Sequence, residues 1–149
     1  MKNGTIQKKA GEKKISLFTL SSPQSAFAIA LQSAASHSFG YEVDKQLYRL
    51  LKEIRSKCEE YTELRQRIFE TQGAQRGNLT FLEGQGLKDL NALNNDIGAQ
   101  KVVLENVPIE IKAFPAGVAA GDMILLENNG IFIVTEEEAK DKHEQNKKP

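Results

Sequence analysis

The stretch YEVDKQLYRLLKEIRSKCEEYTELRQRIFET, residues 41–71, decides the predicted fold. Its apolar residues recur every three or four positions and charged residues fill most of the others, which is the pattern of an amphipathic helix. The apolar stripe consists of Val43, Leu47, Leu50, Ile54, Cys58, Tyr61, Leu64 and Ile68. Gly73 follows where such a helix usually ends. A helix of this length extends about 45 Å, so we expect it to pack against another extended element.

A second, weaker helix is predicted over about 86–104, where leucines and Ile97 fall near one face. Two glycines and three asparagines lower its intrinsic propensity, so it depends on packing against the first helix. The Gly- and Asn-containing segment 72–78 between them has turn chemistry. A connection this short favours an antiparallel helical hairpin over about 42–104.

The segments on either side of the hairpin predict short strands and helices. ISLFTL (15–20) is typical of a strand, and it is followed by a helix over 23–35 with Ser22 as N-cap and Pro23 in the first turn. VPIEIKAF (107–114) alternates apolar and polar residues, as a half-buried strand does.

A short helix over 119–130 and a strand over 131–134 complete the pattern. Shifting the chain by 94 residues lays ISLFTLSSPQSAFAIAL (15–31) over IEIKAFPAGVAAGDMIL (109–125), a weak internal similarity between two strand–turn–helix units. We therefore expect both ends of the chain to share one small sheet at the base of the hairpin. The predicted fold class is α+β.

Length and composition predict a single domain of residues 15–135 between two charged tails. The chain has 149 residues, which suits one domain. The lysine-rich segment 1–14 and the charged segment 136–149 bury too little apolar surface to order themselves, so we expect both to be disordered. The single cysteine excludes an internal disulfide and favours a reducing, cytoplasmic location. No apolar run is long enough to span a membrane.

Charge distribution leaves one nucleic-acid hypothesis open. The 20 basic and 20 acidic residues cancel, which argues against a general nucleic-acid binder. The alternative is a small regulatory nucleic-acid-binding protein that uses the N-terminal lysine tail and helix arginines. Those arginines are Arg49, Arg55, Arg65, Arg67 and Arg76, and their positions scatter around the helix instead of lining one face.

No residue pattern predicts catalysis, a metal ion or a cofactor. Cys58 is the one candidate nucleophile, but it lies mid-helix beside Glu59 and Glu60, and negative charge raises a thiol pKa. A buried structural cysteine is the preferred interpretation. A constellation of Cys58, His37 and Asp96 can be drawn, yet no sequence motif supports it. The chain is therefore predicted not to be an enzyme.

Apolar residues beyond the stripe predict an interaction surface. Tyr48 and Leu51 flank the stripe and Phe69 follows Ile68, so one partner helix does not cover them all. We take these three residues as the candidate interaction surface. Either the terminal units of the same chain or a second copy of the chain can cover them. We take a second copy as the hypothesis, which makes the protein a homo-oligomer.

The order of these elements resembles a group of small phage- and prophage-encoded proteins with a central helical hairpin. The resemblance covers about 15–134 and rests on LYRLLKEIRSKCEEYTELRQRIFE, the turn TQGAQRGN, the strand VPIEIKAF and the helix AAGDMILLE. It implies no catalytic residue. It implies a phage-derived gene, among those for virion assembly. Together with the excess apolar surface and the lack of a catalytic pattern, it predicts a non-enzymatic protein–protein interaction module, a virion-assembly or accessory protein, with a phage or host protein as a further partner.

Overall fold

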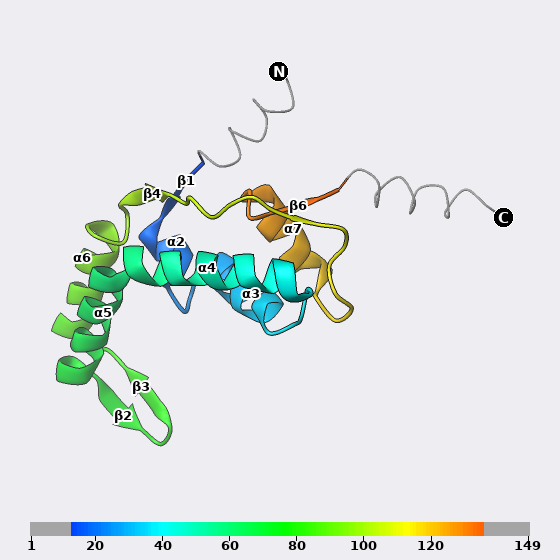
Figure 1. Cartoon of the computed structure of the whole chain (residues 1–149). Helices are drawn as coiled ribbons and strands as arrows, with labels where there is room; N and C mark the ends of the chain where they lie inside the picture. Colours follow the sequence, from blue (N-terminus) through cyan, green and yellow to red (C-terminus); the bar gives the residue numbers. More distant parts are fainter. Residues whose placement is uncertain (1–12, 136–149) are drawn as a thin grey trace.

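The computed structural model describes residues 13–135 and shows helices combined with three small sheets (Figure 1). The predicted α+β class is confirmed. The helices are α2 (Leu17–Ser21), α3 (Ala26–Ala35), α4 (Tyr41–Lys57), α5 (Glu59–Gln72), α6 (Gln85–Asn95) and α7 (Ala120–Asn128). The strands are β1 (Lys14–Ser16), β2 (Ala74–Arg76), β3 (Leu79–Phe81), β4 (Lys101–Val103), β5 (Ile109–Ile111) and β6 (Phe132–Val134). Apart from Lys13 and Lys14, the two predicted tails lie outside the described residues.

The predicted single helix over 41–71 is interrupted at Cys58, and we call this point the elbow. Cys58 has φ −99° and ψ 7°, and its N–H still donates to Ile54 O at 2.9 Å. Beyond it α5 leaves in a different direction from α4 (Figure 1). Ile54, Cys58 and Tyr61 are nevertheless all buried, so the apolar stripe continues across the elbow. The helical period alone therefore does not reveal the bend.

Packing against two different sets of elements explains the bend. α4 packs on α2 and β5, whereas the main partner of α5 is α6. Tyr61 is 1% exposed, and its hydroxyl donates to Asn94 Oδ1 at 2.6 Å. A Cβ at Gly98 would lie 3.0 Å from Tyr61 Cε1, so the absence of a side chain at Gly98 lets this region lie against the tyrosine ring. The elbow thus turns α5 toward α6.

The long antiparallel hairpin over 42–104 is not confirmed, because only α5 and α6 pair in this way. Tyr61 near the start of α5 bonds to Asn94 at the end of α6, and Gln72 at the end of α5 donates to Asp89 at 2.7 Å, nearer the start of α6. α6 ends at Asn95, and the N–H of Gly98 donates to Leu93 O at 2.9 Å to close it. The short helical pair extends only to this point.

Several elements before and after the helical pair differ from the prediction in type or in bounds. Residues 101–103, predicted to be helical, form β4, which pairs antiparallel with β1. Only the first part of ISLFTL is a strand, because the Ser16 hydroxyl accepts from Thr19 N at 3.1 Å and starts α2. α3 begins at Ala26 instead of Pro23, with Ser25 as its N-cap.

The C-terminal elements follow the predicted pattern over shorter ranges. Ile109 and Ile111 are buried on either side of exposed Glu110, as the alternation predicts, and β5 pairs in parallel with β6. The prediction of one small sheet shared by both ends of the chain is wrong. The strands form three separate two-stranded sheets, β1–β4, β2–β3 and β5–β6. The two ends meet through helices, because α3 packs on α7. Phe39 stacks on Phe132 at a centroid distance of 5.3 Å and closes the core beside them.

We expect Gly98→Ala to lower the free energy of unfolding by about 1–3 kcal/mol. The added Cβ would meet Asn94 O at 2.8 Å and Asn94 Cα at 2.9 Å, both backbone atoms of the α6 end. Gly121→Ala is the matched control, since no atom lies within 4 Å of its Cβ position in α7. It should raise the free energy of unfolding by about 0.4–1 kcal/mol. Denaturant unfolding measures both, and equal effects would contradict the tight packing at Gly98.

Candidate interaction surface

The structure brings two of the three predicted surface residues together. Tyr48 is 63% exposed on α4, and Leu51, one turn further along, is partly buried against the core. Phe69 lies beyond the elbow on α5, where the guanidinium of Arg65 covers its ring at 4.7 Å from the centroid. Phe69 faces a different hollow, shared with the β2–β3 hairpin residues Gln75 and Thr80. Tyr48 and Leu51 therefore belong to one surface and Phe69 to another.

Two hollows follow the seam between α3 and α4, and we call them together the α3–α4 groove. One lies between the α2–α3 connection and the end of α4, and the other between the α3–α4 loop and the start of α4. Leu51 lines both, and Tyr48 stands over the second. The groove is lined on the α3 side by Ala28, Ile29, Leu31, Gln32 and Ala35. Its lining combines these apolar side chains with several serines and with Asp44 and Arg55 on the α4 side.

The α3 side of this groove carries no charged side chain. Charged residues make up 27% of the chain, yet residues 15–41 contain no Asp, Glu, Lys or Arg. We call the exposed part of this segment on and beside α3 the uncharged face. It consists of Pro23, Gln24, Ala26, Ile29, Gln32, Ser33, Ser36 and Ser38. Depletion of charge is a feature that distinguishes the centre of protein interfaces from other surface.

Sequence reasoning missed Ile29, the main apolar side chain of the uncharged face. Ile29 is 54% exposed, while Phe27, Ala30, Leu31 and Ala34 form the buried side of α3. The signal was present, because a position two residues after Phe27 falls off the buried stripe of a helix. An isoleucine at such a position marks outward apolar surface. The uncharged run 15–41 was a second signal.

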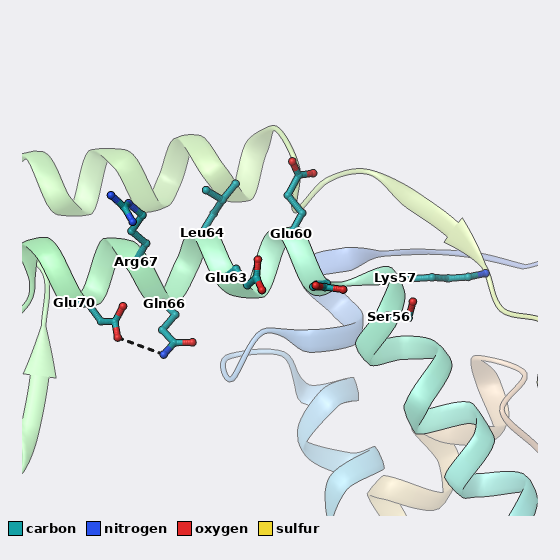
Figure 2. Close-up of a pocket in the computed structure, with 9 residues that line it drawn as sticks. Ser56, Lys57, Glu60, Glu63, Leu64, Gln66, Arg67 and Glu70 are labelled. Carbon is teal, nitrogen blue, oxygen red and sulfur yellow. Dashed lines mark hydrogen bonds between the residues drawn. The ribbon is translucent and has the colours of Figure 1, made fainter.

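A larger hollow at the elbow has a different character. It is lined by Ser56, Lys57, Glu59, Glu60, Glu63, Leu64, Gln66, Arg67 and Glu70. Figure 2 shows these side chains pointing in different directions along α5, without converging on one point. Lys57 reaches away toward β4, where its ammonium donates to Val103 O at 2.7 Å. The hollow is therefore a solvated helix face. Its side chains do not meet at one point where a substrate could be held.

Among the described residues, Glu53 is the carboxylate that accepts the most hydrogen bonds, and its role is structural. It accepts from Glu105 N at 2.6 Å, from Asn106 N at 3.0 Å and from Asn106 Nδ2 at 2.8 Å, and it pairs with Lys57 at 3.0 Å. Burial raises the pKa of Glu53, but these hydrogen bonds outweigh it and the pKa lies below its ordinary value. Glu53 thereby fixes the loop after β4 to α4.

The residues considered for catalysis lie in three separate places. Cys58 is buried at the elbow, and burial raises the pKa of its thiol. His37 lies in the α3–α4 loop, with Nδ1 at 3.1 Å from Ser33 O, and Asp96 follows α6. Within residues 13–135, no cluster of three His, Cys, Asp or Glu side chains is placed to hold a metal ion. None of the helices in that range has the length and apolar character that a bilayer crossing requires.

Comparison of the chain with protein-family models, with curated proteins and with solved structures gives no match.

We expect Cys58 to react slowly with iodoacetamide in the native protein at neutral pH. Its side chain is 1% exposed and its raised pKa leaves little thiolate, which is the form that reacts. Labelling followed by mass spectrometry should accelerate strongly in denaturant, where the thiol is free. Rapid labelling of the native chain would contradict the structural role assigned to Cys58 and reopen the question of a reactive thiol.

Proposed function

We propose that the chain is a non-enzymatic protein–protein interaction module that acts as an oligomer. The observation that carries the proposal is the uncharged face beside the α3–α4 groove, with Ile29 and Tyr48 exposed on its two sides. A partner that covers this surface removes apolar area from water without desolvating a charge on α3. Such a surface fits binding better than it fits catalysis.

The partner in this proposal is a protein with an apolar patch of its own. α3 offers Ile29 with small neighbours, Ala26 and Ser33, so a partner backbone or side chain can approach closely. Tyr48 combines a large apolar ring with a hydroxyl, a combination that is common in interfaces. On the resemblance described above, this partner belongs to the assembly of a phage or prophage particle, or to its host.

Ile29→Asp should abolish capture of this partner, because it places a charge in the centre of the uncharged face. Purified tagged chains, wild type and variant, would be incubated with lysate of the cells that encode them, and the retained proteins identified by mass spectrometry. Asn91→Asp, an exposed position on α6, is the matched control and should retain what the wild type retains.

Two results would contradict this use of the uncharged face. One is an identical set of retained proteins for all three chains. The other is recovery of the tagged chain alone, which removes the separate partner from the proposal and leaves only self-association.

The proposed oligomer has its own test. At micromolar concentration, light scattering after gel filtration should give a mass of two or more copies, which rises toward a plateau with concentration. A mass of one chain across that range would contradict the oligomer, whatever the pull-down shows.

A further inference from the structure

The β2–β3 hairpin projects from the far end of the α5–α6 pair, away from α3 and α4 (Figure 1). Residues 74–80 are all exposed, and only Phe81 is partly covered. Leu79 is 71% exposed, beside the Gly77–Asn78 turn. Two-stranded ribbons are marginal in water by themselves and usually need a further strand or a packed helix. Among the described residues, no further strand pairs with β3.

The register of the hairpin determines which backbone groups face outward. Arg76 pairs with Leu79 across the two-residue turn, and Gln75 pairs with Thr80. In such a hairpin the pair next to the turn is hydrogen-bonded, and the following pair is not. The N–H and C=O of Thr80 therefore point away from β2, along the free edge of β3. Those of Gln75 point along the opposite edge.

Apart from its short length of three residues, the β3 edge lacks the devices that normally protect a free edge. Its residues Leu79, Thr80 and Phe81 include no charge, no proline and no bulge, whereas β2 carries Arg76. Leu79 and Phe81 share one face of the ribbon, because side chains alternate along a strand. Arg76 lies on that face as well, with its guanidinium 4.9 Å from the centre of the Phe81 ring.

We infer that β3 pairs antiparallel with β3 of a second copy, about a twofold axis at Thr80. Thr80 then faces Thr80 of the other copy, and each donates its outward N–H to the carbonyl of the other. In this register Leu79 lies directly opposite Phe81 of the second copy, and the reverse pair forms by symmetry. The four side chains make one apolar cluster, with an Arg76 at each end.

Self-complementarity is what selects a second copy as the occupant. A twofold contact requires each residue of the edge to suit its own symmetry mate. β3 meets this requirement, since threonine pairs with threonine and leucine with phenylalanine. The β2 edge meets it less well, because pairing about Gln75 leaves Arg76 opposite Ala74. This inference rests on the proposed oligomer and names the surface that builds it.

Thr80→Pro tests the pairing, because proline removes the outward N–H of Thr80 and leaves the bonds within the ribbon in place. Gln75→Pro is the matched control, since it removes the equivalent N–H from the β2 edge. Light scattering over a concentration series should show association of Gln75→Pro as in the wild type. The association of Thr80→Pro should be weaker by about tenfold or more.

Equal association of the two proline variants would overturn β3 pairing, while association of the wild type would still support the oligomer. A wild-type mass of one chain would instead contradict the oligomer itself. The two failures are therefore distinguishable.

Disulfide trapping tests the register in folded protein. Leu79→Cys and Phe81→Cys chains, mixed in equal amounts and mildly oxidised, should cross-link to each other more than either variant cross-links to itself. Directly opposite positions of neighbouring strands lie close enough for a disulfide, whereas symmetry mates at 79 or at 81 lie farther apart. Equal self-linking and mixed linking would overturn the Thr80-centred register.

Discussion

The contact between Tyr61 and the Gly98 region holds the elbow, and the placement of the other elements depends on it. Tyr61 is buried, its hydroxyl donates to Asn94 Oδ1 at 2.6 Å, and its ring lies so close to Gly98 that a Cβ there would be 3.0 Å from Tyr61 Cε1. The segment after Gly98 continues directly into β4, which pairs with β1. The N–H of Phe18 also donates to Gly98 O at 2.8 Å, which connects α2 to the same point. One small residue thus joins the helical pair, the first sheet and the start of the chain.

The elbow separates two exposed surfaces that a straight helix would have placed along one line. α4 stays with the body and forms one side of the α3–α4 groove, while α5 leads away to the β2–β3 hairpin (Figure 1). The uncharged face is proposed to bind an apolar patch of another protein, and the β3 edge is proposed to pair with β3 of a second copy. Because the two surfaces lie on different elements, the proposed partner contact and the proposed pairing of two copies do not compete for the same residues. Self-association of such a chain would raise its effective affinity for a partner that engages two copies at once.

Much of the fold follows from apolar periodicity in the sequence. The stripe residues Leu47, Leu50, Ile54, Cys58 and Tyr61 are buried as predicted, and so are Ile109 and Ile111. The elbow could not be predicted, because the bend preserves the helical period and no proline or glycine marks it. Residues 17–20 were predicted as part of a strand because β-branched and large apolar residues favour strands. The Ser16 hydroxyl instead caps a helix there, and α2 forms.

The apolar pattern of the helix also led to the three candidate surface residues, and the structure places two of them together. Tyr48 and Leu51 were found as apolar residues outside the stripe, and they do line the groove. Phe69 was included because the helix was taken as straight, and the elbow moves it to another surface. The exposed positions Ile29 and Leu79 have their meaning only once α3 and the hairpin are placed in space.

A distance between spin labels on α4 and α5 tests the elbow most directly. Spin labels would be attached at positions 45 and 70 in a Cys58→Ala background, and the labelled protein would be diluted with unlabelled chain. Double electron–electron resonance would then measure the distance between the two labels. A straight helix separates these positions by about 37 Å. The elbow predicts a distribution centred well below that distance, and Gly98→Ala should broaden it. A narrow distribution near the straight-helix distance would contradict the bend and the separation of surfaces that follows from it.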